Sequence, residues 1–188
     1  MISTEDVVLR GFRPPDLKAV KDLIDITIRV SYSAYPTEFM DYWMETHSDK
    51  QVLEDASKGF VVVLEHQGRI IGTGTFVDEG IKRVFVHRSY QGKGFGTLIM
   101  HALEEHAVTT GARSLTLTST LASKPFYDSL GYATLRQVVF ATVNGMKLGY
   151  CLMNRKLGIL LNRGRRSLKT SVRLAKCLYG CQDRWCHS

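Results

Sequence analysis

The chain has no long apolar stretch, although 44% of its residues are hydrophobic. None of its runs approaches the roughly 20 residues that a membrane-spanning helix needs. The stretch from Met1 to Asp6 also lacks the basic start and apolar centre of a secretory signal peptide. Internal repeats and low-complexity tracts are absent as well. We therefore expect a globular protein of the cytoplasm without a membrane span.

Cysteine is scarce, with four residues in 188. A domain of about 150 residues buries roughly 70% of its unfolded surface, so it folds without crosslinks, and cytoplasmic thiols stay mostly reduced. Cys177, Cys181 and Cys186 lack the Cys-x-x-Cys spacing of common zinc sites. Cys151 stands alone in an apolar segment, where a core position is expected. We predict neither a metal site nor a nucleophilic cysteine.

Acidic residues are almost missing from the C-terminal segment. From Arg155 onward lie nine of the 25 Lys and Arg residues but one of the 18 Asp and Glu residues, so this segment has net charge +8 and the rest −1. We expect a domain over residues 1–156 and a basic extension over 157–188. The extension is a candidate amphipathic helix for anionic lipid or nucleic acid such as RNA. The alternatives are disorder, or packing on its own domain or on a second subunit.

The common nucleotide-binding loops are absent too. A glycine-rich stretch over residues 84–97 follows an apolar run and precedes an apolar stripe of helical period. It fits neither the Rossmann pattern nor the P-loop pattern, because its order is Gln91-x-x-Gly94-x-Gly96. A strand, a glycine loop and a helix start leave backbone N–H groups free at the positive end of the helix dipole. The stretch therefore predicts a cradle for phosphate groups.

Apolar periodicity predicts a mixed α/β chain. Strands are expected over residues 7–12, 60–64, 70–77, 81–87, 113–118, 132–142 and 146–153. Helices are expected from Pro14, Thr37, Ser48, Phe95 and Ser123. The predicted order is β-α-α-β-β-β-α-β-α-β-β. Because hairpins link most of the central strands, the sheet should be mixed and not doubly wound.

A second pattern, ASKPFYDSLGY, occupies residues 122–132, about 30 residues after the loop. The two patterns together resemble the GNAT superfamily of acetyl-CoA-dependent N-acetyltransferases. That family's loop reads Gln/Arg-x-x-Gly-x-Gly/Ala, and its later motif reads Ala-x-x-Phe-Tyr-x-x-Leu-Gly-Phe/Tyr. The resemblance covers roughly residues 6–156 and extends to the predicted element order. It implies a GNAT-like acyl-CoA N-acyltransferase fold, with a mixed, mostly antiparallel twisted sheet flanked by helices.

The resemblance also implies where acetyl-CoA binds. Backbone groups of Phe85 and Val86 would pair with the pantetheine arm, and Phe126 would lie along the thiol end. Many relatives have an Asn that bonds pantetheine where this chain has Ser119 and Thr120, so the Ser119 hydroxyl is expected to substitute in part. The residues implied to hold the pyrophosphate are Gln91, Gly92, Lys93, Gly94, Phe95, Gly96 and Thr97.

Two catalytic groups are expected from the chemistry of acetyl transfer. The departing thiolate benefits from an acid, which the family often places at the position of Tyr127; the alternative is an aromatic ring packed beneath the cofactor. An alkyl ammonium must lose a proton before it attacks, and Glu79 is the predicted base. The alternatives are that Glu79 is a solvated turn residue, or that Asp78, Glu65 or His87 serves instead. Backbone N–H groups would stabilise the tetrahedral oxyanion.

The predicted function is direct transfer of acetyl from acetyl-CoA to a primary amine in a ternary complex, without a covalent enzyme intermediate. The amine belongs to a small molecule, a peptide N-terminus or a protein lysine. Two alternatives stay open: a non-catalytic CoA-binding or interaction module, and an RNA-directed acetyltransferase that uses the basic extension. Substrate contacts are expected from the final hairpin and from the aromatic residues over 32–44. This aromatic segment is otherwise interpreted as core packing or as a homodimer contact.

Overall fold

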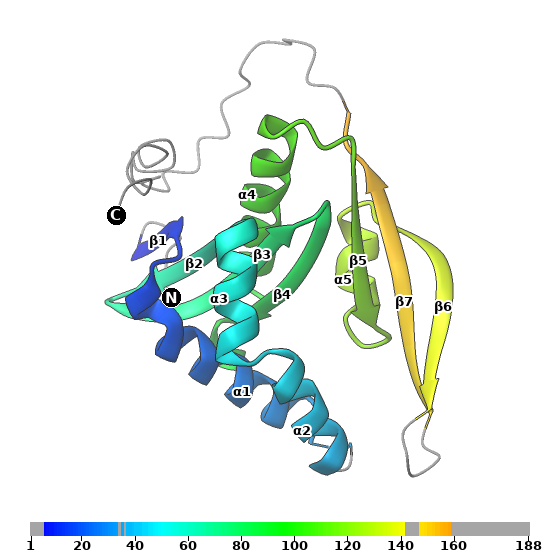
Figure 1. The fold of residues 1–188 in the computed structure, drawn as a ribbon, viewed down its shortest axis with the longest axis horizontal. Coiled ribbons are helices and arrows are strands. Elements are labelled where there is room, and N and C mark those ends of the chain that lie inside the picture. Colours follow the sequence, from blue (N-terminus) through cyan, green and yellow to red (C-terminus); the bar gives the residue numbers. More distant parts are fainter. Residues whose placement is uncertain (1–5, 34, 36, 142–146, 159–188) are drawn as a thin grey trace.

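Figure 1 shows the fold of the chain in a computed structural model that describes residues 6–33, 35, 37–141 and 147–158. Between the first two strands lie three helices, which follow the predicted helix starts at Pro14, Thr37 and Ser48, although the predicted order counted only two. The other elements follow one another as predicted. In chain order they are β1 (Val7–Gly11), a 3-10 turn (Pro14–Asp16), α1 (Leu17–Ser31), α2 (Thr37–Thr46), α3 (Asp49–Lys58), β2 (Phe60–His66), β3 (Arg69–Val77), β4 (Gly80–Val86), a second 3-10 turn (Arg88–Tyr90), α4 (Phe95–Thr109), β5 (Ser114–Thr120), α5 (Lys124–Ser129), β6 (Ala133–Ala141) and β7 (Lys147–Lys156).

The seven strands form one sheet in the order β1-β2-β3-β4-β5-β7-β6. Every neighbouring pair is antiparallel except β4 and β5, which run parallel. The prediction of a mixed, mostly antiparallel sheet is thus confirmed. The single parallel pair lies in the middle of the sheet, and it joins strands β1 to β4 to the C-terminal strands (Figure 1).

Helices cover both faces of the sheet. Side chains of a strand alternate between faces, and β2 buries Val62 and Leu64 in one core cluster and Val63 in another. The first cluster contains Ile99 of α4, and the second contains Ile24 of α1. Helices α1 and α4 therefore lie on opposite faces, so the chain must cross the plane of the sheet between them, through the glycine-rich loop.

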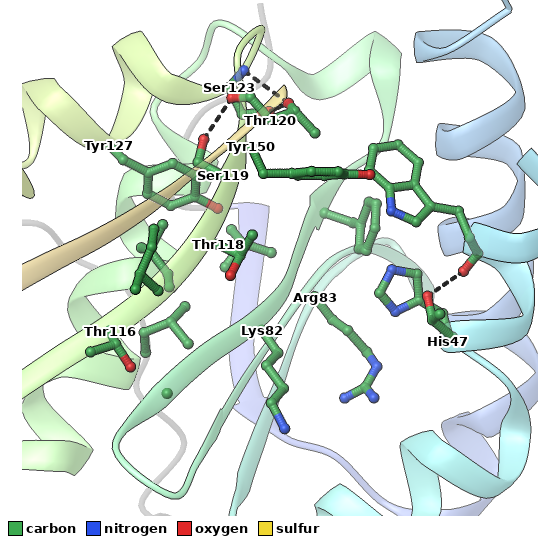
Figure 2. A pocket seen from close by; sticks show the side chains of 18 of the residues that line it. His47, Lys82, Arg83, Thr116, Thr118, Ser119, Thr120, Ser123, Tyr127 and Tyr150 are labelled. Carbon is green, nitrogen blue, oxygen red and sulfur yellow. Dashed lines mark hydrogen bonds between the residues drawn. The ribbon is translucent and has the colours of Figure 1, made fainter. Parts of the chain in front are cut away.

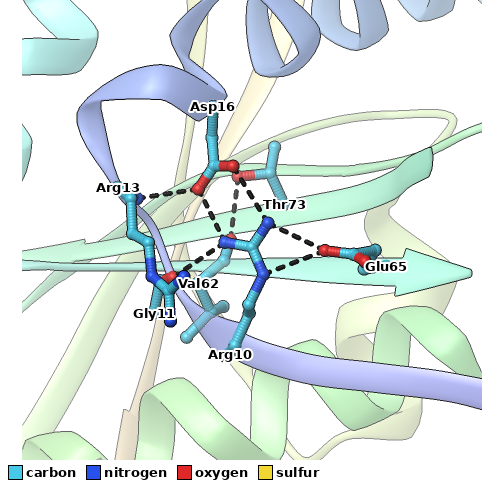
Figure 3. Close-up of polar contacts among 7 residues, drawn as sticks. All are labelled: Arg10, Gly11, Arg13, Asp16, Val62, Glu65 and Thr73. Atoms are coloured by element: carbon cyan, nitrogen blue, oxygen red, sulfur yellow. Dashed lines mark hydrogen bonds and ion pairs between the residues drawn. The ribbon is translucent and has the colours of Figure 1, made fainter. Parts of the chain in front are cut away.

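A polar network ties the start of α1 to the edge of the sheet (Figure 3). The Arg10 guanidinium donates to Asp16 Oδ2 at 2.7 Å and to Glu65 Oε2 at 2.8 Å. The Arg13 backbone N–H donates to Asp16 as well, at 2.8 Å. These hydrogen bonds hold the pKa of Asp16 below its usual range, and the bond from Arg10 has the largest effect. The predicted helix start at Pro14 to Asp16 is confirmed, and the network fixes the direction in which α1 leaves the sheet.

Strand β4 contains a bulge opposite β3. Thr73 lies opposite Phe85 and Thr75 opposite Lys82, so β4 has one residue more than β3 over this stretch. Arg83, within the extra stretch, has a positive φ of 52°. A non-glycine residue in the left-handed region is strained by about 1–2 kcal/mol. Bulges re-aim side chains and increase the local twist, and this one lies at the strand that the resemblance assigns to the cofactor.

Among the helices of the described ranges, none is long and apolar enough to cross a membrane. The predicted basic extension over 157–188 lies outside the described residues from 159 onward. So do Cys177, Cys181 and Cys186. Cys151 is fully buried in the core, as its apolar surroundings predicted.

Candidate functional site

Strands β4 and β5 pair only where β4 begins. Their register contains Gly80 opposite Thr116 and Ile81 opposite Leu117. The Thr116 N–H also donates to the Glu79 carbonyl at 3.0 Å, which closes this end. Beyond Ile81 comes the bulge, and the added twist of a bulge accounts for the divergence of the two strands seen in Figure 1.

Two cavities adjoin the diverging strands. The first, here called the strand cavity, has a volume of about 530 Å³ and lies between β4 and β5. The second, the loop cavity, has a volume of about 560 Å³ and lies beside the glycine-rich loop and the start of α4. Both are lined by Tyr32, Val84, Phe85, Ser123 and Tyr127. The two cavities therefore share a wall, at which ligands in each would meet.

The glycine-rich loop presents the amides of α4 to the loop cavity. Gly94, the N-cap of α4, has a φ of 82°, a conformation that glycine adopts at little cost. The first intrahelical bond of α4 runs from Leu98 N–H to the Gly94 carbonyl at 3.0 Å. The N–H groups at the first turn thus have no intrahelical partner. Gly96 and Thr97, which belong to this turn, line the cavity, as expected for a phosphate cradle.

The two sequence motifs are in contact with each other. A Cβ atom at Gly96 would lie 3.1 Å from Cζ of Phe126, so the loop glycine lets α5 approach the start of α4. Phe126, Gln91, Gly92 and Phe95 all line the loop cavity. The Gln91 side-chain amide donates to the Val86 carbonyl at 2.8 Å and holds the loop against the strand end. Among the implied pyrophosphate residues, Lys93 differs: it is exposed, and its ammonium donates to the Ser89 carbonyl at 2.9 Å.

Tyr127 lies on the wall between the cavities. Its side chain is buried, with 9% exposed, and Figure 2 shows its hydroxyl pointing into the strand cavity. Burial, and then the neighbouring Tyr32, raise the pKa of Tyr127 well above the usual tyrosine value. The hydroxyl therefore carries its proton throughout the physiological range. A buried, protonated hydroxyl that faces two cavities is suited to donate a proton there.

Hydroxyl groups of β5 and the following turn line one side of the strand cavity (Figure 2). Ser119 is buried, and its hydroxyl donates to the Thr120 carbonyl at 2.8 Å. The Thr120 hydroxyl donates to Ser123 Oγ at 3.1 Å. Ser119, predicted as a contact of the cofactor, lines the strand cavity and is absent from the residues lining the loop cavity.

Aromatic rings lie next to these hydroxyl groups, and the Tyr32 hydroxyl is 3.4 Å from Thr120 Oγ1. The ring centroids of Tyr32 and Trp43 are 4.4 Å apart, and those of Trp43 and Tyr150 are 5.9 Å apart. Tyr32 follows α1, Trp43 belongs to α2, and Tyr150 comes from β7. The aromatic segment over 32–44 and the final hairpin thus both contribute to the strand cavity, and the same rings also pack on one another.

The predicted base does not reach the cavities. Glu79 and Asp78 are exposed in the turn between β3 and β4, with φ values of 57° and 52°. Glu65 is engaged by Arg10, and the His87 ring accepts from the Ser89 N–H at 3.3 Å. None of these side chains lines either cavity. Within the described residues, no group of three or more His, Cys, Asp or Glu side chains could hold a metal ion.

Sequence reasoning missed three residues that line the strand cavity: His47, Lys82 and Arg83. His47 lies between two helices, and its ring meets that of Phe85 edge-on with centroids 5.4 Å apart. Burial, and then the charges of Arg83 and Lys21, lower the pKa of His47 to about 4. Its imidazole is therefore neutral at pH 7. A short-range pattern could not have found this residue, because its environment comes from β4 and α1.

The pKa of His47 predicts an effect of acid on stability. The ordinary pKa of histidine is 6.5, and that of His47 in the folded chain is about 4. Between these two pH values the unfolded chain binds a proton at this histidine and the folded chain does not. Stability must therefore fall as the pH drops through this window. After a discount for partial exposure we expect His47→Gln to reduce the loss of unfolding free energy between pH 7.5 and 4.5 by about 2 kcal/mol.

Urea titrations at the two pH values measure this difference. His101→Gln, at an exposed position of α4, serves as the control. An identical pH dependence in the two variants would contradict the assignment.

Comparison with known proteins agrees with this geometry. A model of the acetyltransferase (GNAT) domain matches residues 25–147. A curated relative, an uncharacterized acetyltransferase from Streptococcus pyogenes serotype M3, is 29% identical over 92 residues, which are 46% of this chain. The match spans 65% of that relative, slightly less than two thirds of its length.

Solved structures share the fold. A GCN5-related N-acetyltransferase from Rhodopseudomonas palustris aligns with a TM-score of 0.72 at 22% identity, over 84% of this chain and 99% of that one. The PaiA N-acetyltransferase from Thermoplasma acidophilum, solved in complex with coenzyme A, aligns with a TM-score of 0.65 at 16% identity, over 80% and 99% of the two chains. At these identities the likeness concerns the fold. Because the domain model matches well over half of the chain, this protein belongs to the GNAT acetyltransferase superfamily.

Proposed function

We propose that the protein is an N-acetyltransferase that moves the acetyl group of acetyl-CoA directly to a primary amine. The observation that carries the proposal is the wall shared by the two cavities, where Tyr127 lies. A donor in the loop cavity and an acceptor in the strand cavity would meet at this wall. Holding both reactants in one geometry removes much of the entropic cost of a bimolecular reaction.

The loop cavity suits acetyl-CoA. The amides at the start of α4 would hold the pyrophosphate, because unpaired N–H groups and the helix dipole favour anions. The Val86 carbonyl accepts from Gln91, but the other backbone groups of β4 around Phe85 and Val86 lack a paired strand on the β5 side, so they are available to the pantetheine arm. Phe126 lies beside Gly96 and would flank the thiol end. These assignments follow the family resemblance, and the cavity supports them.

The chemistry in this proposal moves protons off nitrogen and onto sulfur. The ammonium first loses a proton to water, and the amine nitrogen attacks the thioester carbonyl; the nitrogen then releases its second proton to water as the C–S bond breaks and the amide forms. The Tyr127 hydroxyl gives its proton to the departing thiolate and regains one from solvent. Because Cys151 is buried in the core and lines neither cavity, the transfer has no cysteine nucleophile within the described part of the chain.

Calorimetry with acetyl-CoA and a thiol-release assay with a panel of amines test the function. Binding at micromolar to millimolar cofactor, followed by CoA release that depends on the amine, is the expected result. An absence of binding at millimolar acetyl-CoA would overturn the proposal. Binding without release for every amine would favour the alternative, a non-catalytic CoA-binding module.

The role of Glu79 as the base is an untested prediction, and the exposed position of its carboxylate argues against that role. Since its carboxylate is exposed and lines neither cavity, it would have to act through a chain of water molecules. We expect Glu79→Gln to change kcat by less than about threefold, far below the 10²–10⁴ of a positioned acid or base. Asp78→Asn is the matched control in the same turn. A fall in kcat of tenfold or more for Glu79→Gln alone would establish it as the base.

A further inference from the structure

The bulge of β4 places two consecutive basic residues on the same wall. In a regular strand, neighbouring side chains point to opposite faces. Here the positive φ of Arg83 breaks the alternation, and Lys82 and Arg83 both line the strand cavity. Both also approach one carboxylate: Arg83 pairs with Asp55, and Lys82 Nζ lies 3.8 Å from Asp55 Oδ2. The two positive charges thus lie side by side.

Arg83 is almost completely buried and only partly satisfied. Its side chain is 4% exposed, and one terminal nitrogen pairs with Asp55, itself 5% exposed. The Arg83 Nε atom has no hydrogen-bond partner. A buried guanidinium normally has its donors paired, because an unpaired one loses hydration without compensation. An arginine left in this state on the wall of a cavity points to an acceptor that a ligand supplies.

The charges around the strand cavity do not balance. Two cations line it, while no Asp or Glu of the described chain appears among its lining residues. Asp55 lies behind the wall and is already engaged by Gln51 at 3.4 Å, as well as by Arg83. One positive charge is thus left uncompensated. Burial is the main cause of the lowered pKa of His47, and the charge of Arg83 lowers it further.

We infer that the acceptor amine carries a second, anionic group, a carboxylate or a phosphate, which Lys82 and Arg83 bind in the strand cavity. This inference rests on the proposed function, since it names the class of acceptor for the same site. Arginine and lysine recognise such oxyanions through charge-assisted hydrogen bonds.

The layout of the cavity fits a molecule with an amine at one end and an oxyanion at the other. In Figure 2, Lys82 and Arg83 lie on the side of the cavity away from Ser119, Thr120 and Ser123. Tyr127, at the wall shared with the loop cavity, lies near the hydroxyl side (Figure 2). The amine would therefore face the thioester while the oxyanion stays with the cations. A neutral amine would leave the Arg83 Nε without an acceptor and two cations sharing the single carboxylate of Asp55.

A matched series of amines tests the inference. The probes are ω-amino acids of increasing length, their neutral amides and the corresponding ω-aminoalkyl phosphates. The amine is the same in all of them, and the group at the other end is a carboxylate, a neutral amide or a phosphate. We expect kcat/KM for an acid to exceed that of its amide by about 10- to 100-fold at the best length, from a charge-assisted bond. The carboxylate and phosphate arms show which oxyanion is preferred.

Variants of the full chain assign the preference to residues. Lys82→Gln, at a half-exposed side chain, and Arg83→Lys, which keeps the charge but loses the guanidinium fork, should each lower the acid-to-amide ratio about tenfold. Lys58→Gln is the control, because Lys58 is exposed on α3 and pairs with Glu54. Circular dichroism and acetyl-CoA affinity confirm that each variant is folded. Amides that react as well as acids at every length, or a ratio unchanged in both variants, would overturn the inference.

A failure of the proposed function would look different. In that case no probe, acidic or neutral, would release CoA. Thermal shift of the CoA-loaded protein then tests the anion site alone. A larger stabilisation by the acids than by the amides, lost in Lys82→Gln, supports the site; equal stabilisation rejects it.

Discussion

Tyr127→Phe is expected to lower kcat for amine acetylation by about 100-fold or more, while the Kd for acetyl-CoA stays unchanged. The reason is that a positioned proton donor contributes typically 10²–10⁴-fold, and the ring that lines both cavities is retained. The raised pKa of Tyr127 keeps the wild-type group protonated. Assays of thiol release measure kcat, and calorimetry measures the Kd for acetyl-CoA, so the effects on catalysis and on binding are separated.

A second buried tyrosine provides the control. Tyr132, whose ring centroid is 6.1 Å from that of Tyr127, donates its hydroxyl to Glu104 Oε1 at 3.0 Å and lines neither cavity. Tyr132→Phe should lower the free energy of unfolding by about 1–3 kcal/mol, with kcat retained, since Glu104 Oε1 loses one of its two donors and keeps Arg155. Equal kcat in wild type and Tyr127→Phe would show that Tyr127 is only a packed aromatic ring.

Gly96→Val is expected to raise the Kd for acetyl-CoA by about 100-fold, or about 2.7 kcal/mol. A Cβ at this position meets Phe126 at 3.1 Å, so the larger side chain must displace that ring or project into the loop cavity. Either outcome removes space in which a pyrophosphate could approach the amides. Gly96→Ala, with a single methyl group, should have an intermediate effect.

The control is a glycine in open surroundings. A Cβ at Gly11 of β1 meets nothing within 4 Å, its φ is not in the left-handed region, and it lines neither cavity. Gly11→Val should therefore leave the Kd for acetyl-CoA within about twofold of wild type. If Gly96→Val is folded, as thermal unfolding will show, and binds acetyl-CoA normally, then the loop cavity is not the donor site.

Most of the fold was predictable because its signals are local. The apolar period of α1 and α4, the glycine at the start of α4 and the hairpins depend on residues close in the chain. The loop and the ASKPFYDSLGY motif were likewise recognisable, since each is a short contiguous stretch. The helix that begins after Ser48 was also predicted from a local pattern, although the predicted element order counted two helices and not three between β1 and β2.

The acceptor side of the site was not predictable in the same way. The expectation about Glu79 came from its place before a strand, yet the turn directs it to solvent. Lys82 and Arg83 are consecutive in a strand, where an alternating pattern assigns them to opposite faces. Only the bulge opposite Thr73 and Thr75 brings both to one wall, and a bulge depends on the register of two strands.

The sequence by itself determined the family and most of the element order, and it predicted the phosphate cradle, because each of these depends on contiguous residues. The tertiary structure decided what that cradle adjoins. Tyr32, Arg83, Tyr127 and Tyr150 come from four separated segments, and they line one cavity only because β4 and β5 diverge beyond their two paired positions. Such convergence depends on long-range packing and strand register, which no local pattern encodes.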